Sequence, residues 1–187
     1  MGIFAVHVSP FMIPLYPEKR TIVVLDLDHT LVHTVLFHED HEAFANTETF
    51  RVGHNDGTTS TVFVRPHTFR FLETLSGAGI KYAVWTAGTE EYARDVCAGL
   101  AWSYPAFSPE FVYDRSHTEV VGGRHLKNIS SITSVEKVIL IDDDPSHGHF
   151  SNRNSHVMVV PKFRYTSPDD VVFHLLAERV LAFFCLF

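Results

Sequence analysis

Two aspartates, Asp26 and Asp28, stand two residues apart directly after the apolar run Thr21 to Leu25. Because side chains alternate along an extended chain, this spacing places both carboxylates on the same side. Two acids in that position can bind a hard cation and divide the roles of nucleophile and acid/base between them. The same pair is also typical of an acidic turn after a core strand, so its meaning depends on the rest of the chain.

Three further polar groups extend the pattern. Thr86 and the acidic run 142–144 each follow an apolar run typical of a strand, and Lys127 lies in a polar segment that we expect to be a loop. Each has an ordinary structural explanation: a helix N-terminus for Thr86, a solvated cation for Lys127, and a helix-start acid cluster for 142–144. Open α/β sheets bind ligands beyond the carboxyl ends of their strands. Along the chain, an acid pair is followed by a hydroxyl, a lysine and a second group of acids. This order therefore favours one site that contains all four.

These groups lie in four segments: DLDHTLVHT at 26–34, VWTAGTEEYA at 84–93, HLKNIS at 125–130 and LIDDDP at 140–145. The four segments resemble the motifs of the haloacid dehalogenase superfamily. More narrowly, they resemble the phosphatases that act on the C-terminal domain of RNA polymerase II, also called NLI-interacting-factor-like phosphatases. The resemblance runs from Lys19 to Phe163.

The resemblance implies a Mg²⁺-dependent phosphatase. Asp26 would attack phosphorus and form an aspartyl-phosphate, and Asp28 would protonate the leaving oxygen and then activate water. Thr86 and Lys127 would bind the phosphoryl group as catalytic and substrate-binding residues. The ligands of Mg²⁺ would be Asp26, the backbone carbonyl of Asp28, and Asp143, a set of oxygens that suits this ion.

Supporting roles follow from the same resemblance. Arg115 would lie near the substrate, although an ordinary loop arginine is the alternative, Thr30 would fix the nucleophile loop, and Asp142 would orient Lys127 or a metal-bound water. Two positions depart from the family pattern. Gly88 stands where Ser or a similar small polar residue is usual, and His29 stands where an acid is common. Neither change removes a catalytic atom.

The substrate implied by the resemblance is a phosphoprotein or phosphopeptide carrying phosphoserine or phosphothreonine, with the C-terminal domain of RNA polymerase II as a candidate. Two alternatives stay open. The first is a small-metabolite phosphatase of the same superfamily. The second is a catalytically inactive phosphopeptide-binding module, which the intact set of catalytic residues argues against.

Composition narrows the class of protein. The 187 residues are 45% hydrophobic and 20% charged, which predicts one domain over 1–187. A formal charge of −7 without a Lys/Arg cluster disfavours direct nucleic-acid binding. Two cysteines without paired spacing favour an intracellular setting, and thirteen histidines without carboxylate or Cys partners at ligand spacing do not indicate zinc. The apolar segment 2–16 lacks a basic start, and 171–187 is too short and interrupted for a bilayer span, so no membrane association is expected.

The apolar pattern predicts an α/β fold, a Rossmann-like parallel sheet flanked by helices, with a β-hairpin insertion at 36–65 between the first and second motifs. The predicted strands and helices are 21–26, 80–85, 137–141 and 156–160, and 67–77, 89–100 and 168–184.

The insertion has two parts. Its hairpin pairs 49–54 with 58–64 around Asp56-Gly57, and its first part, 37–44, is acidic and aromatic. In the resembled family this insertion helps to bind the peptide. The aromatic candidates for that contact, which could equally hold the hairpin to the domain, are Phe37, Phe44, Phe50 and Phe63.

The last helix is expected to begin with Ser167 as its cap and Pro168 in its first position. Its apolar face is expected to bury Val172, Leu175, Leu176 and Phe183.

Overall fold

A parallel sheet forms the centre of the molecule. The structure, a computed structural model, describes residues 21–36, 47–132, 137–146, 148–149, 155–167 and 170–185. Five strands pair in the order β11-β9-β1-β5-β6, and every neighbouring pair is parallel. Their bounds are β1 Thr21–Leu25, β5 Lys81–Trp85, β6 Val112–Tyr113, β9 Lys137–Asp142 and β11 Ser155–Val159. The four predicted strands and the Rossmann-like sheet are confirmed.

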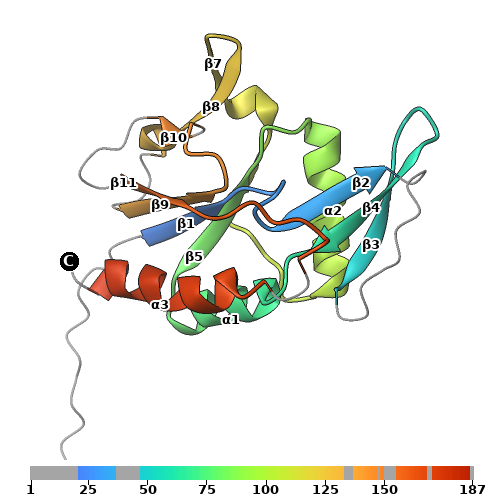
Figure 1. Cartoon of the computed structure of the whole chain (residues 1–187). Helices are drawn as coiled ribbons and strands as arrows, with labels where there is room; N and C mark the ends of the chain where they lie inside the picture. Colours follow the sequence, from blue (N-terminus) through green and yellow to red (C-terminus); the bar gives the residue numbers. More distant parts are fainter. Residues whose placement is uncertain are drawn as a thin grey trace, which may run out of the picture.

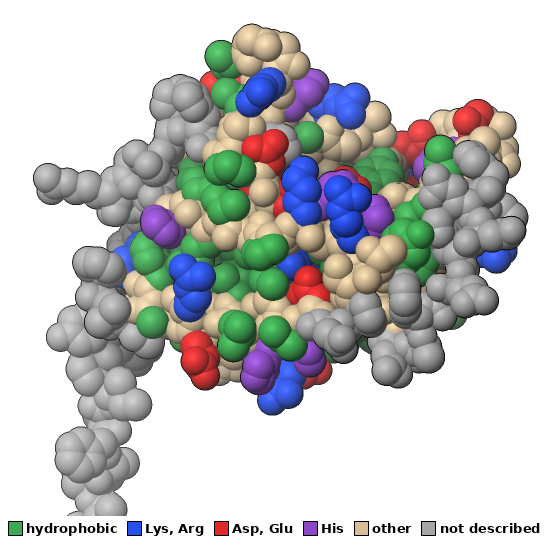
Figure 2. Space-filling model, viewed as in Figure 1, with side chains coloured by type: hydrophobic (Ala, Val, Ile, Leu, Met, Phe, Trp, Pro, Cys, Tyr) green, Lys and Arg blue, Asp and Glu red, His purple; other side chains and the backbone are tan. Residues whose placement is uncertain are grey.

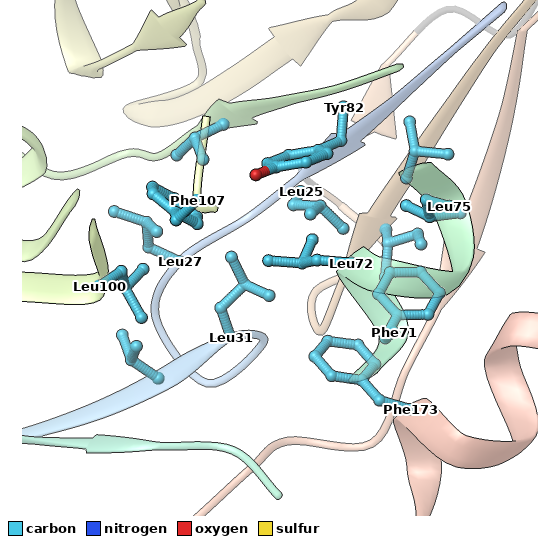
Figure 3. Close-up of a cluster of buried hydrophobic side chains, with 14 of the residues drawn as sticks. Leu25, Leu27, Leu31, Phe71, Leu72, Leu75, Tyr82, Leu100, Phe107 and Phe173 are labelled. Carbon is cyan, nitrogen blue, oxygen red and sulfur yellow. The ribbon is translucent and has the colours of Figure 1, made fainter. Parts of the chain in front are cut away.

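The two faces of this sheet bury alternate residues of each strand. In β1, Val23 and Leu25 belong to one cluster of buried side chains, whereas Ile22 and Val24 belong to the other. This alternation explains why the central strands read as unbroken apolar runs, since both faces are covered. Figure 3 shows the larger cluster, where Leu25 of β1 lies among side chains from the helices and from the loop after β1.

Three α-helices contribute to the larger cluster: α1 (Thr68–Gly77), α2 (Glu90–Ser103) and α3 (Val172–Cys185). Helices α1 and α3 lie side by side beneath the sheet in Figure 1. Phe71 of α1 stacks on Phe173 of α3 at a ring distance of 4.9 Å. The other face is covered by Ile129 and Ile132, from the 3₁₀ helix η2 (Ile129–Ser131) and the residue after it. None of the described helices is long and apolar enough to cross a membrane.

A second sheet lies beside the first and carries the insertion. It is antiparallel in the order β2-β4-β3, with bounds β2 Val32–Leu36, β3 Thr49–Gly53 and β4 Thr59–Val64 (Figure 1). The predicted hairpin is confirmed, with Gly57 at φ +81° in its turn. Strand β2 was not predicted, and it begins at Val32, within the first motif segment 26–34.

The aromatic residues of this sheet hold it to the domain. Phe63 is buried and stacks on Tyr165 at 4.7 Å, and the Phe50 ring lies where a side chain on Gly99 of α2 would be. The predicted contact segment 37–44, with Phe37 and Phe44, lies outside the described residues, as does the apolar segment 2–16.

A small hairpin brings Lys127 into the fold. Strand β7 (Glu119–Val121) turns through Gly122 and Gly123, both at positive φ, into β8 (Arg124–Asn128), and β8 also pairs with β10 (Gly148–His149). The 3₁₀ helix η1 (Arg115–His117) precedes β7. The expectation that Lys127 lies in a loop is wrong, because Lys127 is part of β8, and the alternative of a solvated cation is excluded because the residue is fully buried.

The last helix begins later than predicted. Residues 170 and 171 are not helical, and α3 starts at Val172, whose backbone N–H donates to Asp170 Oδ1 at 3.0 Å. The cap is therefore Asp170, not Ser167, and the predicted start at Pro168 is wrong. Of the predicted apolar face, Leu176 is buried and Val172 and Phe183 pack against the core. The prediction is wrong for Leu175, which is 58% exposed, whereas Phe173 is buried instead.

Candidate active site

The catalytic candidates meet at the carboxyl ends of three neighbouring strands. Leu25, the last residue of β1, is level with Val84 of β5 and with Ile141 of β9. Asp26, Thr86 and Asp142 therefore occupy the same edge of the sheet, as the strand-end argument predicted. A pocket of about 270 Å³ opens there, and it is lined by Asp26, Asp28, His29, Thr86, Ala87, Gly88, Arg115, Asp143, Asp144 and Lys162.

Lys127 lies behind this pocket and does not line it. Its ammonium donates to Asp26 Oδ1 at 2.5 Å and to Asp142 Oδ2 at 2.6 Å, and all three side chains are buried. The other oxygen of Asp142 accepts the backbone N–H of Asp144 at 2.9 Å. Asp142 thus fixes the lysine and the turn after β9, which is the supporting role expected of it.

Burial and charge set the protonation of this group. Desolvation raises the pKa of Asp26 to about 7, since the attraction of Lys127 lowers it less than burial and the neighbouring Asp142 raise it. Desolvation lowers the pKa of Lys127, but Asp26 and Asp142 together raise it above its ordinary value. Lys127 is therefore charged, and it can neutralise only one of the two carboxylates that it contacts.

The carboxylates form a candidate cation site. Oxygens of Asp26, Asp142 and Asp143 lie within 4.8 Å of one another. Both oxygens of Asp142 are already engaged, whereas Asp26 contacts Lys127 through Oδ1 alone and Asp143 contacts Lys162 through Oδ2 at 3.3 Å. Hard oxygen donors in this number fit Mg²⁺, which uses one or two carboxylates and keeps several waters.

Asp28 points into the same pocket from the loop after β1. The hydroxyl of Tyr92, on α2, donates a hydrogen bond to Asp28 Oδ1. Burial raises the pKa of Asp28, and this hydrogen bond lowers it in part. Asp28 is half-buried, and it lines the pocket together with Asp26.

Thr86 and Arg115 also line the pocket. Thr86 Oγ accepts the backbone N–H of Gly88 at 2.9 Å. Arg115 donates through Nε to the Ala87 carbonyl at 2.6 Å, and its backbone N–H donates to the Gly88 carbonyl at 2.8 Å. These contacts hold Arg115 against the segment that follows Thr86.

Lys162 and His29 complete the rim. Lys162 is half-exposed and paired with Asp143, and lysine, arginine and histidine side chains gather in the middle of the face shown in Figure 2. His29 has φ +61° and is held by Phe163, whose N–H donates to the His29 carbonyl at 2.7 Å. Lys162 was missed by the sequence analysis, although it follows a predicted strand as Asp26 and Thr86 do.

Thr30 is fully buried below this loop. Its backbone N–H donates to the Leu27 carbonyl at 3.2 Å, and its hydroxyl has no hydrogen-bond partner among the residues that the structure describes. Its carbonyl accepts from Arg65, so Thr30 contributes to the shape of the loop and does not reach the pocket.

Comparison with known proteins identifies the group to which these features belong. A family model described as NLI interacting factor-like phosphatase matches residues 21–181. The human CTD small phosphatase-like protein is 29% identical over 174 residues, which cover 84% of this chain and 60% of the relative. The RNA polymerase II C-terminal domain phosphatase-like 4 of Arabidopsis thaliana is 25% identical over 166 residues, covering 82% of this chain and 36% of the relative. The chain thus spans less than two thirds of either relative.

Solved structures share the fold. A structure of the fission yeast RNA polymerase II CTD phosphatase Fcp1 bound to beryllium fluoride matches with a TM-score of 0.56 and 19% identity, over 78% of this chain and 42% of that one. A second structure of Fcp1 matches with a TM-score of 0.57 and 20% identity, over 88% of this chain and 49% of that one. At this identity the likeness concerns the fold alone. The family-model match over 161 of 187 residues (181 − 21 + 1) shows that the chain belongs to the NLI interacting factor-like phosphatase family.

Proposed function

We propose that the protein is a Mg²⁺-dependent phosphatase that hydrolyses phosphoserine or phosphothreonine in a protein substrate. The observation that carries this proposal is the buried arrangement in which Lys127 bridges Asp26 and Asp142 at the edge of a pocket. A buried carboxylate held by a lysine, with further carboxylates beside it, is costly to maintain for stability alone. The arrangement suits a site that receives a cation and a phosphate.

Asp26 is the proposed nucleophile. Its Oδ1 is fixed by Lys127, so its second oxygen can attack phosphorus and form an aspartyl-phosphate. Lys127 does not line the pocket, so it would contact the phosphoryl group only from the side of Asp26. Its proposed role is to stabilise the negative charge of the carboxylates during attack. Thr86 and Arg115 are the proposed donors to the phosphoryl oxygens, because both line the pocket with Asp26.

Asp28 is the proposed general acid and base. It would protonate the serine oxygen as the phosphorus–oxygen bond breaks, and then take a proton from the water that hydrolyses the aspartyl-phosphate. A raised pKa suits a carboxyl group that must hold a proton in the first half of this cycle.

Asp26, Asp143 and the Asp28 carbonyl are the groups that would hold Mg²⁺. When bound, the ion would screen the negative charge of the phosphate so that it can approach the Asp26 carboxylate. Lys162 contacts Oδ2 of Asp143, so the other oxygen of this carboxylate is the one that would receive the cation.

The substrate class rests on the family and on the shape of the site. Relatives bear names of phosphatases for the RNA polymerase II C-terminal domain, which makes this domain a candidate substrate here. The pocket is rimmed by partly exposed side chains of Lys162, His29 and Arg115, which leaves room for a chain that continues on both sides of a phosphorylated residue.

Turnover of a phosphoserine peptide, an aryl phosphate and small sugar phosphates, each with Mg²⁺ and with chelator, tests the proposal. We expect peptide and aryl phosphate hydrolysis with Mg²⁺ only, and none by Asp26→Asn. The matched control Asp95→Asn changes a carboxylate that pairs with Arg94 on α2, away from the pocket, and should leave turnover unchanged.

The alternatives have distinct outcomes in the same assay. Preference for sugar phosphates over every peptide would indicate a small-metabolite phosphatase. Peptide binding by the unmodified protein without turnover would indicate a binding module. Full activity in chelator, or an active Asp26→Asn variant, would contradict the mechanism.

A further inference from the structure

Tyr92 lies outside the pocket but is directed at one of its acids. It is the third residue of α2, and its backbone N–H donates to the side chain of the cap residue Thr89 at 3.4 Å. Its ring is half-buried and its hydroxyl reaches Asp28 Oδ1. Because the backbone of Tyr92 is fixed by the helix cap, its hydroxyl is delivered from a rigid element.

A second hydroxyl orients the first. Thr34 Oγ, on β2 of the insertion sheet, lies 2.7 Å from the Tyr92 hydroxyl oxygen. A phenol has a single proton, and Tyr92 gives it to the Asp28 carboxylate, so Thr34 must be the donor to Tyr92. The hydrogen bonds therefore run from Thr34 through Tyr92 to Asp28, and they join the insertion sheet, α2 and the nucleophile loop.

The absence of a side chain at Gly88 makes room for this contact. A Cβ at Gly88 would lie 2.6 Å from Tyr92 Cδ1, which is closer than real Cβ atoms approach, and 3.2 Å from Thr86 Oγ. Any larger residue at this position would have to displace the Tyr92 ring. The glycine that replaces the usual small polar residue thus has a steric consequence beside Asp28.

We propose that Tyr92 is a positioning residue for the acid/base Asp28, and that Thr34 holds the Tyr92 hydroxyl in the orientation this requires. The proposal rests on the proposed function, in which Asp28 protonates the leaving oxygen. Asp28 is hydrogen-bonded by Tyr92 and by no other side chain among the described residues. Without that bond its carboxyl group can rotate away from the leaving oxygen, and proton transfer depends strongly on such geometry.

The proposal is tested by Tyr92→Phe, which keeps the ring and removes the hydroxyl. The kcat for a phosphoserine peptide, whose leaving group needs a proton, should fall on the order of tenfold, a fraction of the total contribution of acid/base catalysis. The KM should stay unchanged because Tyr92 does not line the pocket. The kcat for an aryl phosphate with a good leaving group should change by less than about twofold.

Thr34→Val should give a smaller loss of the same kind, and Thr34→Ser, which restores a hydroxyl, should recover the wild-type rate. The control is Thr61→Val, which removes a hydroxyl from β4 of the same sheet and should leave both substrates unaffected. In an Asp28→Ala background, Tyr92→Phe should cause no further loss, because Tyr92 acts through Asp28.

Parallel losses on both substrates, a raised KM with unchanged kcat, or a full further loss in the Asp28→Ala background would overturn the proposal while the phosphatase assignment stands. A wild-type protein that hydrolyses neither substrate with Mg²⁺ would overturn both. Thermal melting shows whether each variant is folded, and if Tyr92→Phe is not, the Thr34→Val and Thr34→Ser pair decides.

Discussion

Replacing Asp170 by Asn should destabilise the protein far more than an ordinary surface change, because Asp170 neutralises a fully buried arginine. Arg65 donates through Nε and Nη2 to the two carboxylate oxygens of Asp170 at 3.0 and 2.9 Å, and the two side chains are 0% and 8% exposed. The guanidinium also donates to the carbonyls of Thr30 at 3.2 Å and Pro161 at 2.8 Å. Removing the carboxylate leaves a buried charge without its counterion.

The expected loss in the free energy of unfolding follows from these contacts. Breaking a buried ion pair by removing one partner costs about 3–5 kcal/mol. Arg65→Met should lose a similar amount, since Asp170 loses its counterion and the buried Thr30 carbonyl loses its donor, an unsatisfied buried group costing about 1–3 kcal/mol. The double variant should lose less than the sum of the two single variants by about 1–3 kcal/mol, because neither charge is then stranded.

Urea unfolding monitored by circular dichroism gives these free energies, provided that the m-value is unchanged. The control is Lys81→Met, which removes a surface pair with Glu110 at 3.1 Å whose side chains are 70% and 47% exposed. That change should stay within about 0.5 kcal/mol. A loss below about 1 kcal/mol for Asp170→Asn would refute the reasoning, since asparagine can still cap the helix and the whole expected loss of about 3–5 kcal/mol comes from the missing counterion.

Three other predictions concern the packing of side chains in the core. Gly99→Ala should destabilise the protein in urea unfolding, although alanine favours helices by about 1 kcal/mol, because its Cβ would lie 2.1 Å from the Phe50 ring. Phe173→Ala should cost about 3–5 kcal/mol and Leu175→Ala less than about 0.5 kcal/mol; the reverse order would show that the face of α3 is misassigned. Burial raises the pKa of Cys97 to about 12, so at pH 8 its thiol is protonated and iodoacetamide should label it, by peptide mass spectrometry, only when the protein unfolds; rapid labelling of folded protein would contradict this.

The strand-end positions could be predicted because their signals are local. A run of apolar residues followed by a polar group indicates a buried strand and the place where it ends, and this rule located Asp26, Thr86 and the acids after β9. The parallel order of the strands then brings these residues together. Lys162 obeys the same rule, and applying it to the last strand would have found it. The organisation of 1–187 as a single domain stays a prediction.

Other features depend on contacts that a linear pattern does not contain. Lys127 lies in a polar segment typical of an exposed loop, and its burial follows from two carboxylates that are distant in sequence. Arg65 likewise pairs with a residue 105 positions away. In the sequence, Asp170 is an acid near the predicted start of a helix. Neither its ion pair nor the later start of α3 could be predicted from that position alone. Strand β2 was hidden because His33 and Thr34 interrupt its apolar pattern.

The same long-range contacts determine the shape of the nucleophile loop. Three of its residues are each held by a different segment: Asp28 by Tyr92 of α2, His29 by Phe163 after β11, and Thr30 by Arg65 after β4. The loop carries the proposed nucleophile and acid, and its own backbone hydrogen bonds shape its turn around the Leu27 carbonyl, whereas these three contacts join it to the rest of the fold. Catalytic geometry therefore depends on the insertion sheet and the C-terminal segment being folded against the central sheet. It follows that the Arg65–Asp170 pair, which joins these two parts, should affect turnover as well as stability, even though neither residue lines the pocket.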